Sequence, residues 1–415
     1  MYRTLCRIAS SVVCCAALLA DPPAAPRTAE GFPDLALIPP PLNTRPGPEY
    51  GDDMRKFQGI PTIERASNGR LWAAWYGGGS GEDPFNYLVL VTSGDDGVSW
   101  SKPVLVVDPP GFVHTWEPSL WHDPSGRLWF FWSQSFGRWD GRGGVWAITA
   151  DDSRSATTGW SQPRRIADGD MLNKPTALST GEWLLPVAFW PMPADHATVN
   201  SKYNLGWTPT LIRYMTHDFG PDRGASVVFG SRDKGRSFER LGQAVVPDVG
   251  HNEPMIVERK DKSLWMLIRT TYGIGESVST DRGHTWSEGK PSGIPHVVAR
   301  FHIRRLASGA LLLVRHNPQE FGKVIGKGRS HLSAFLSQDD GKTWSGGLLL
   351  DARENVSYPD SVEGPGGRLY IIYDRERIGA REILMAQVTE KEVAAGKLAE
   401  GSGSRLTVLI NKAVD

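Results

Sequence analysis

The chain contains very little cysteine. Only three occur in 415 residues, at Cys6, Cys14 and Cys15, so the remainder of the chain has none. This excludes a disulfide framework as the source of stability. A chain of this length is long enough to form a large hydrophobic core instead.

Net charge is also absent, because Lys plus Arg and Asp plus Glu both total 46. A balanced chain argues against nucleic acid or an anionic membrane surface as the main partner. After the first 20 residues, no segment is apolar enough to cross a bilayer. Glycine, proline and tryptophan are instead plentiful, at 46, 30 and 16 residues. Such a composition is typical of many short strands joined by turns.

The beginning of the chain predicts export. Residues 1–20 combine two early arginines with an apolar run, Ile8 to Ala20, that is too short to span a bilayer permanently. We therefore expect a signal peptide and a secreted or periplasmic protein; a lipid anchor on Cys14 or Cys15 is the less favoured alternative. Residues 21–48 are rich in proline and are predicted to form a linker or arm.

One short motif occurs four times in the pattern S-x-D-x-G-x-[ST]-[WF]. The copies begin at Ser93, Ser231, Ser279 and Ser337. Asp and Ser side chains can bond the backbone of their own turn, Gly accepts a positive φ, and the aromatic residue can pack into a sheet. The motif therefore predicts a stapled hairpin turn, and a calcium loop is the less favoured alternative.

A second repeat alternates with the first and consists of a strand-like run, a turn and another strand-like run. Its six copies have their turns at Gly69, Gly126, Gly181, Lys262, Gly309 and Gly367. A four-stranded unit repeated six times predicts an all-β fold, a six-bladed β-propeller spanning residues 49–415. We expect a terminal strand to close the ring, and the candidates are Arg405–Asn411 and Asp34–Ile38.

The first strand of each propeller blade lines the central axis, so the residues that open these strands meet on one face. They are Ile60, Glu117, Lys174, Glu253, Arg300 and Tyr358. The second strands return to the same face and bring Arg269 and Asp374, and a third strand begins near Arg329. A glycine-rich loop rising from this face carries Glu82 and Asp83. Converging arginines suit a carboxylate ligand, although a ring of structural ion pairs is the alternative.

These features together resemble the bacterial sialidases and their relatives with Asp-box, or BNR, repeats. The resemblance runs from about Phe57 to Lys412. The motif H-N-E-P places Glu253 sixteen residues before Arg269, and V-S-Y-P-D contains Tyr358. Arg329 lies eight residues before the last boxed Ser.

The resemblance implies a role for each matching residue. Tyr358 would be the nucleophile and Glu253 its base, while Arg269 and Arg329 would hold the substrate carboxylate. Asp83, or Glu82 beside it, would be the general acid. Asp374 occupies the position of a family glutamate that supports the first arginine of a three-arginine clamp.

The chain departs from the family where the first blade opens. The family has Arg-Ile-Pro there, whereas this chain has Gln58 and Gly59 before Ile60-Pro61. We expect Gln58 to offer an amide in place of the missing cation. Loss of one charge-assisted hydrogen bond would weaken carboxylate binding roughly ten- to a hundredfold. Further pocket candidates without a family role are Lys174, Arg300, Glu117 and His114.

The sequence therefore predicts a secreted, sialidase-like retaining exo-glycosidase acting on acidic glycans. We expect a monomer that needs no metal or cofactor and binds no nucleic acid. Two alternatives remain. A non-catalytic glycan-binding propeller is favoured by the missing arginine and disfavoured by the Tyr358–Glu253 pair. A polysaccharide lyase would use Tyr358 or one of His114, His251 and His302 to remove a proton next to a uronate carboxyl group.

Overall fold

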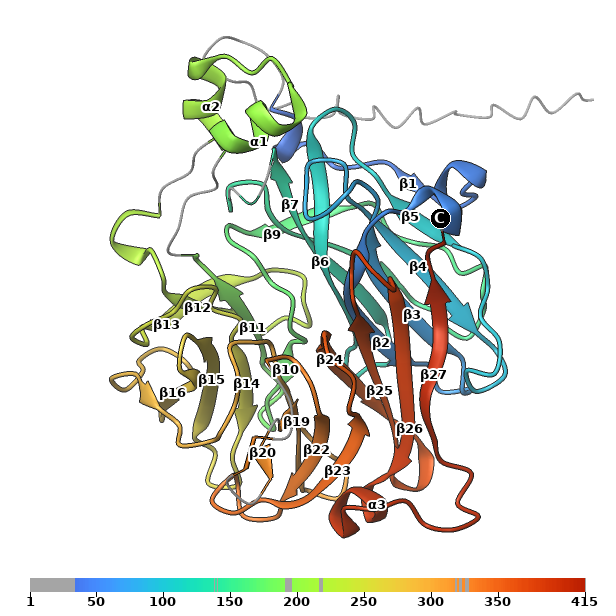
Figure 1. Cartoon of the computed structure of the whole chain (residues 1–415). Helices are drawn as coiled ribbons and strands as arrows, with labels where there is room; N and C mark the ends of the chain where they lie inside the picture. Colours follow the sequence, from blue (N-terminus) through green and yellow to red (C-terminus); the bar gives the residue numbers. More distant parts are fainter. Residues whose placement is uncertain are drawn as a thin grey trace, which may run out of the picture.

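The predicted six-bladed β-propeller is confirmed in a computed structural model of the chain. The structure describes residues 34–137, 139, 141–190, 196–215, 219–317, 319–320, 323–324 and 328–414. Six antiparallel sheets stand in a ring around a central channel (Figure 1). The predicted signal peptide and residues 21–33 of the predicted arm lie outside the described residues.

Blades one to three follow one another along the chain, and the innermost strand of each comes first. Blade one comprises β2 (Gln58–Arg65), β3 (Leu71–Gly77), β4 (Tyr87–Ser93) and β5 (Leu105–Val107), with β1 (Leu42–Asn43) added at its outer edge. Blade two comprises β6 (Val113–His122), β7 (Leu128–Phe136), β8 (Gly144–Ala150) and β9 (Arg164–Ala167). Blade three comprises β10 (Thr176–Ala177), β11 (Trp183–Ala188), β12 (Ser226–Ser231) and β13 (Glu239–Ala244).

Blades four to six repeat this arrangement. Blade four comprises β14 (Met255–Glu258), β15 (Leu264–Thr270), β16 (Gly273–Ser279) and β17 (Lys290–Pro291). Blade five comprises β18 (His302–Arg305), β19 (Leu311–His316), β22 (Leu332–Ser337) and β23 (Ser345–Asp351), with the small hairpin β20 (Gln319–Glu320) and β21 (Lys323–Val324) between its second and third strands. Blade six comprises β24 (Val356–Glu363), β25 (Arg368–Arg375), β26 (Glu382–Thr389) and β27 (Arg405–Lys412).

The core is divided among the spaces between neighbouring blades. Six of the seven hydrophobic clusters in the described part of the chain each draw their buried side chains mainly from two adjacent sheets. Because a blade packs on both faces, its second strand is apolar along most of its length; every residue of β3, for example, is buried. This explains why the sequence shows continuous apolar runs in these strands instead of a polar–apolar alternation.

The four boxed turns are staples, as the sequence predicts. In the first, Asp95 accepts hydrogen bonds from the Ser93 hydroxyl at 2.7 Å and from the Ser99 backbone N–H at 3.0 Å. The other three boxes repeat this pattern at Asp233, Asp281 and Asp339. In each box the hydroxyl of the Ser or Thr four residues after the aspartate also donates to its carboxylate. That bond first, and then the others, hold the pKa of each of the four aspartates at about 2.

The ring closes differently from the prediction. Arg405–Lys412 does form a strand, β27, but it is the outer strand of blade six, whose other three strands directly precede it. Within Asp34–Ile38 the structure has a 3-10 helix, η1 (Leu35–Leu37), in place of a strand. Blades one and six therefore meet by side-chain packing and polar contacts, such as the 2.7 Å bond from the Thr62 hydroxyl to Asp360.

Three inner strands share an irregularity at the mouth of the channel. β2, β6 and β24 each have a register shift against the next strand, at Ile60, Glu117 and Tyr358. These three residues have positive φ angles of 58°, 49° and 52°, and a proline follows each of them. Positive φ is uncommon outside glycine and is often found at functional sites. A bulge of this kind redirects a side chain, here toward the channel mouth.

Two short helices lie beyond the ends of the strands at this side of the ring (Figure 1). α1 (His196–Tyr203) and α2 (Pro209–Met215) belong to the long connection inside blade three and were not predicted. The remaining helices are α3 (Glu390–Ala395), η2 (Pro48–Tyr50), η3 (Asp52–Met54), η4 (Gly220–Asp222) and η5 (Pro365–Gly367). None of the helices in the described part of the chain is long and apolar enough to span a membrane.

Candidate active site

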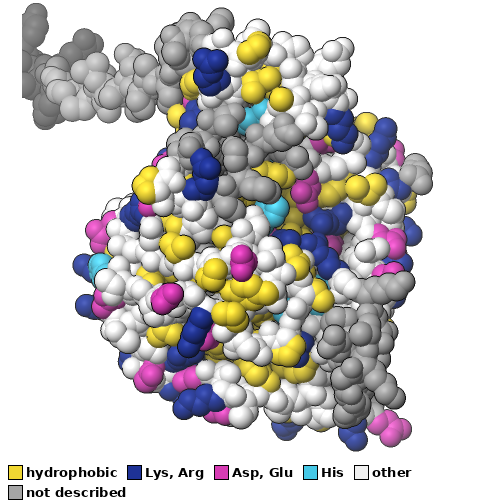
Figure 2. Space-filling model, turned by 60° about the vertical axis from the view of Figure 1, so that its left-hand side comes forward, with side chains coloured by type: hydrophobic (Ala, Val, Ile, Leu, Met, Phe, Trp, Pro, Cys, Tyr) yellow, Lys and Arg dark blue, Asp and Glu magenta, His cyan; other side chains and the backbone are white. Residues whose placement is uncertain are grey.

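A cavity of about 140 Å³ lies at the mouth of the channel, and we call it the mouth cavity. Its walls come from all six blades. The lining residues are Ile60, Tyr76, Glu82, Trp116, Glu117, Trp139, Trp190, His251, Glu253, Arg269, Arg329, Tyr358 and Arg377. Figure 2 shows Lys and Arg side chains gathered beside a hollow in the visible face, whereas the two charge signs are interspersed elsewhere.

Three polar groups from blades four and six meet in this cavity. The Tyr358 hydroxyl donates to Oε1 of Glu253 at 3.2 Å, and Nη1 of Arg269 donates to the same oxygen at 2.8 Å. Nη1 of Arg269 also lies 3.3 Å from the Tyr358 hydroxyl oxygen. All three residues are buried. The geometry joins a phenol, a proton acceptor and a cation within hydrogen-bond distance.

The Tyr358 phenol is kept neutral in this state. Burial and the Glu253 carboxylate raise its pKa, and the nearby Arg269, Arg329 and Arg377 offset this only in part. A neutral phenol needs a base before it can attack an electrophile, and Glu253 is placed to be that base.

Glu117, across the cavity, has no such cation partner. Burial is the largest of the effects that raise the pKa of Glu117 well above its usual range. The nearby carboxylates of Asp170, Glu253 and Glu82 raise it further, and Arg300 lowers it by less. Its Oε2 has no hydrogen-bond partner among the described residues. Glu117 is therefore held toward its neutral form and offers a hydrogen-bond donor to a ligand.

Two arginines flank the ring of Tyr358. The Cζ atom of Arg329 lies 5.4 Å from the ring centroid, and the Cζ atom of Arg377 lies 5.0 Å from it. Arg329 also donates to the Ser357 hydroxyl at 3.1 Å. With Arg269, three guanidinium groups therefore border the nucleophile candidate, although the sequence predicted only two.

Arg377 occupies the space into which a side chain at position 59 would extend. A Cβ atom placed on Gly59 would lie 2.3 Å from Cδ and 2.4 Å from Cγ of Arg377. The stem of Arg377 thus crosses directly over Gly59, and no larger residue fits at position 59 while Arg377 is there. Asp374, three residues before Arg377, accepts a 2.7 Å bond from the Ile60 backbone N–H. Burial, only partly offset by Arg377, raises the pKa of Asp374 to about 6.

With this geometry described, comparison with known proteins becomes informative. The profile of the BNR repeat-like domain family matches residues 69–371, which is most of the chain. The chain belongs to the BNR repeat-like family. Among curated protein sequences, none matches it significantly.

Solved structures share the fold of this BNR-family chain at low sequence identity. A microbial sialidase from the Hadza is 18% identical, with a TM-score of 0.58, and the alignment covers 83% of this chain and 68% of that one. The leech intramolecular trans-sialidase is 14% identical, with a TM-score of 0.57 and coverages of 83% and 69%. A protein of unknown function from Dyadobacter fermentans DSM 18053 is 16% identical, with a TM-score of 0.56 and coverages of 79% and 92%. At these identities the likeness concerns the fold.

Gln58 does not face the mouth of this BNR-family propeller, contrary to the expectation. Its Oε1 accepts from Nε of Arg55 and from the Trp75 indole, both at 3.0 Å. Its Nε2 donates to the Arg381 carbonyl at 2.6 Å and to Oδ1 of Asn411 at 3.0 Å. The amide is fully used inside the protein, because the bulge at Ile60 breaks the alternation that would have aligned Gln58 with the cavity.

The two acids on the first-blade loop have different roles. Glu82 lines the mouth cavity, and its Oε1 lies 2.5 Å from Nη1 of Arg377. Asp83 is buried and accepts hydrogen bonds from the backbone N–H groups of Ser80 and Phe85 and from the Tyr203 hydroxyl. Asp83 therefore shapes the loop and connects it to α1, while Glu82 is the acid presented to a ligand.

Three further candidates lie outside the cavity lining. His114 is buried on β6, with its ring centroid 5.9 Å from that of Trp116. Arg300 is buried below the cavity, where its Nε donates to Oδ1 of Asn173 at 2.8 Å. Because Nδ2 of Asn173 donates to the backbone oxygens of Glu253 and Pro254, Arg300 supports the position of Glu253 indirectly.

The third, Lys174, is committed to the interior of the channel. Its Nζ donates to Oε1 of Glu64 at 2.8 Å and to the carbonyl oxygens of Ile63 and Leu120, which uses all three of its protons. It also lies 3.2 Å from Asp360. Lys174 is therefore a structural cation.

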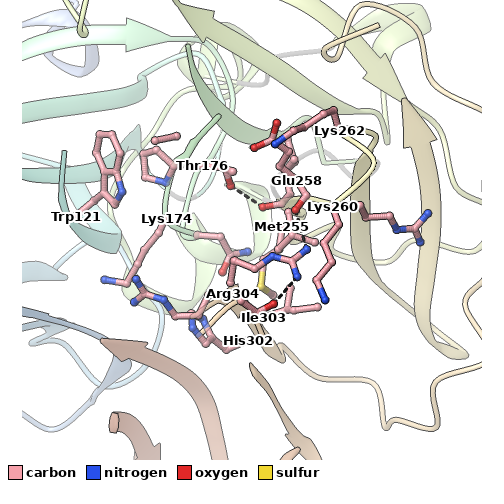
Figure 3. A pocket seen from close by; sticks show the side chains of 18 residues that line it. Trp121, Lys174, Thr176, Met255, Glu258, Lys260, Lys262, His302, Ile303 and Arg304 are labelled. Atoms are coloured by element: carbon pink, nitrogen blue, oxygen red, sulfur yellow. Dashed lines mark hydrogen bonds between the residues drawn. The ribbon is translucent and has the colours of Figure 1, made fainter. Parts of the chain in front are cut away.

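A second cavity, of about 430 Å³, is formed by the inner strands of blades three to five (Figure 3). Lys174, His302 and Arg304 lie on one side of it, while Lys260 and Lys262 project from another (Figure 3). Its basic groups are largely paired: Arg305 bonds the Glu258 carbonyl and lies 2.6 Å from Asp340, and Nζ of Lys260 donates to the Gln338 carbonyl. Its greater size does not make it the better candidate, because its cations are engaged by the protein itself.

An aromatic wall completes the mouth cavity. Trp190 lies 4.9 Å from Trp116, 5.4 Å from Trp139 and 4.7 Å from His251 between ring centroids. The indole N–H groups of Trp116 and Trp190 have no hydrogen-bond partner within the described part of the chain. The wall offers apolar faces and two donors to a sugar-like ligand.

Sequence reasoning missed two residues of the site, Arg377 and Trp190. Trp190 follows β11 in the long third-blade connection, where no repeat defines the register. A signal for Arg377 did exist: it follows Asp374 by three residues, at the same face as the empty arginine position.

Proposed function

We propose that the protein is a retaining exo-glycosidase that removes terminal ulosonic acids, sugars whose anomeric carbon bears a carboxylate, from glycans. The observation that carries this proposal is the bond between the Tyr358 hydroxyl and Glu253 inside a border of arginines. Binding alone requires no nucleophile next to a base, so this pair favours catalysis over a lectin role. Sialidases among the structures of similar fold add support by analogy.

In the first step, the Tyr358 oxygen attacks the anomeric carbon while Glu253 takes the phenolic proton. The glycosidic C–O bond breaks, and Glu82 delivers a proton to the leaving oxygen. A neutral phenol suits this carbon because a carboxylate nucleophile would be repelled by the substrate carboxylate, and tyrosine nucleophiles are the recognised exception among retaining glycosidases. Arg269 stabilises the negative charge as it passes from Glu253 to the phenol oxygen during the proton transfer.

In the second step, water attacks the glycosyl–Tyr358 intermediate. Glu82 takes a proton from the water as the new C–O bond forms, and Glu253 returns its proton to the departing phenol oxygen. The free sugar leaves with the configuration of the substrate. Two displacements at one carbon give retention, because each inverts it once.

The decisive experiment traps the intermediate. Wild type and Tyr358→Phe are incubated with difluoro analogues of N-acetylneuraminic acid and of the eight-carbon deoxy-ulosonic acid, and then analysed by peptide mass spectrometry. We expect the wild type to gain the mass of a sugar on the peptide containing Tyr358. Proton NMR of a methylumbelliferyl glycoside reaction should show the retained anomer first.

Other outcomes identify the competing functions. An inverted first product, or labelling of another residue, would rule out Tyr358 as the nucleophile. A product absorbing in the ultraviolet would show an unsaturated uronate and hence a lyase. Binding of these acids without any turnover would support the glycan-binding alternative.

A further inference from the structure

We infer that Arg377 supplies the third arm of a carboxylate clamp from the last blade, at the place where Gly59 vacates the first, and that Glu82 holds this position until a substrate carboxylate displaces it. This inference rests on the proposed function. It concerns a residue that no position in the repeat pattern marks.

The first support is steric. Cγ and Cδ of Arg377 lie where a side chain on residue 59 would begin. The space therefore holds only one long side chain, which can come from residue 59 in blade one or from Arg377 in blade six. Its guanidinium group lies over the ring of Tyr358. The Gln58 side chain cannot reach this ring, because it is buried and bonded to the Arg381 carbonyl. Arg55, the nearest upstream arginine, is engaged with Gln58 and the Tyr50 carbonyl. The cation at this position therefore comes from Arg377.

The second support is electrostatic. Burial would lower the pKa of Arg377, but the carboxylates of Glu82 and Asp374 outweigh it and raise the pKa. Glu82 is the exposed member of this pair of acids, with 36% of its side chain accessible, whereas Asp374 is buried and fixed to Ile60. A ligand carboxylate can take the place of Glu82 without disturbing the fold. An ion pair with this much exposure is weak enough to exchange.

The exchange has a chemical consequence. The arrival of an acidic substrate would free the Glu82 carboxyl group from Arg377 and leave it available to the leaving oxygen. A neutral sugar of the same shape would leave the Glu82–Arg377 pair intact, so the clamp would select acidic substrates in both binding and turnover.

Calorimetric titration tests the assignment with unsaturated analogues of N-acetylneuraminic acid and of the eight-carbon deoxy-ulosonic acid, each as the acid and as the carboxamide. We expect Arg377→Ala to weaken acid binding about ten- to a hundredfold and to change carboxamide binding less than about threefold. Gly59→Ala should weaken acid binding in the same direction, because the new Cβ displaces the Arg377 stem. In Gly59→Ala/Arg377→Ala the two losses should not add, since both act on one side chain.

A relocation variant serves as the positive control. Gly59→Arg combined with Arg377→Gly returns the cation to the first blade, and we expect it to recover most of the acid affinity lost in Arg377→Ala. Glu82→Gln should bind the acid as tightly as wild type or up to tenfold tighter, because the competing carboxylate is gone.

The outcomes separate the two ideas. If wild type binds the acids and Arg377→Ala binds acid and carboxamide with unchanged affinity, the Arg377 assignment is overturned while the proposed function stands. Equal losses for acid and carboxamide would show a merely structural role and also overturn it. If wild type binds none of the acids, the proposed function and the clamp fail together.

Discussion

The mouth cavity and the channel interior contain similar charged residues but differ in how completely these residues are paired. In the interior, Lys174 pairs with Glu64 and Asp360, and Asp360 also lies 3.3 Å from His302. At the mouth, Oε2 of Glu117, Oε2 of Glu253 and Nε of Arg269 lack hydrogen-bond partners among the residues described. Buried polar groups normally find partners, so an unsatisfied set at an accessible cavity points to a ligand.

The pKa values express the same contrast. Burial favours the neutral form at both places, but Lys174 and other cations outweigh it in the interior and hold the pKa values of Glu64 and Asp360 at about 2. At the mouth, burial prevails and raises the pKa of Glu117 well above its usual range. Paired charge stabilises the ring, and poorly paired charge is available for chemistry.

The largest expected effect is loss of the nucleophile. Tyr358→Phe should lower kcat by at least about a thousandfold, because the phenyl ring keeps the packing but cannot form the covalent bond. Turnover of a methylumbelliferyl ulosonic acid glycoside measures it. The matched control is Tyr370→Phe in the same blade, which loses only its hydroxyl bond to Asp96 and should stay active. Full activity of Tyr358→Phe would contradict the assignment of Tyr358 as the nucleophile of the mouth cavity.

Removing the interior cation should reduce stability. Lys174→Met leaves the buried carboxylates of Glu64 and Asp360 without their main partner, and breaking a buried pair costs about 3–5 kcal/mol of unfolding free energy. Urea denaturation at neutral pH measures it.

The pH dependence of this loss provides the check. Both carboxylates have lowered pKa values, so the stability they contribute is present above about pH 4 and is lost as the pH falls toward 2. The deficit of Lys174→Met should therefore shrink in acid. A deficit that is independent of pH would show that packing, and not charge, dominates at this position.

Substitutions of the two loop acids, Glu82 and Asp83, should affect different properties of the protein. Glu82→Gln is expected to lower kcat about 10²- to 10³-fold by removing the general acid, with little change in melting temperature. Asp83→Asn should instead lower the melting temperature and reduce kcat less, because Asp83 bonds the loop backbone and Tyr203. Glycosides with a strongly acidic leaving group should restore the first step in Glu82→Gln. The reverse pattern would exchange the two assignments.

The smallest effect is predicted for Glu117→Gln. A raised pKa means that wild type loses stability as the pH rises above about 4, since the unfolded chain ionises more readily than the buried carboxyl. The variant has no such group, so it should be more stable than wild type at pH 7. Chemical denaturation at pH 4 and pH 7 tests this, and the advantage should vanish at the lower pH.

The sequence predicted the six blades and most of the candidate site because the repeats define where each inner strand opens. Tyr358, Glu253 and Arg269 follow from that register and meet as predicted. Gln58 was misplaced because the positive φ of Ile60 interrupts the strand's alternation, which no pattern of residue types announces. Arg377 was missed because its position depends on a loop crossing a neighbouring blade. Glu82 and Asp83 could not be told apart, since adjacent loop residues point in different directions.

The seam between the first and last blades has one more consequence. Within the described residues no strand is exchanged between these two blades, yet the contacts from Asp374 to Ile60, from Asp360 to Thr62 and from Arg377 to Glu82 all cross the seam. The proposed clamp would therefore be incomplete until blade six has docked against blade one. Enzymatic activity would then serve as a direct readout of complete assembly, and a partially folded molecule with five well-formed blades would be silent.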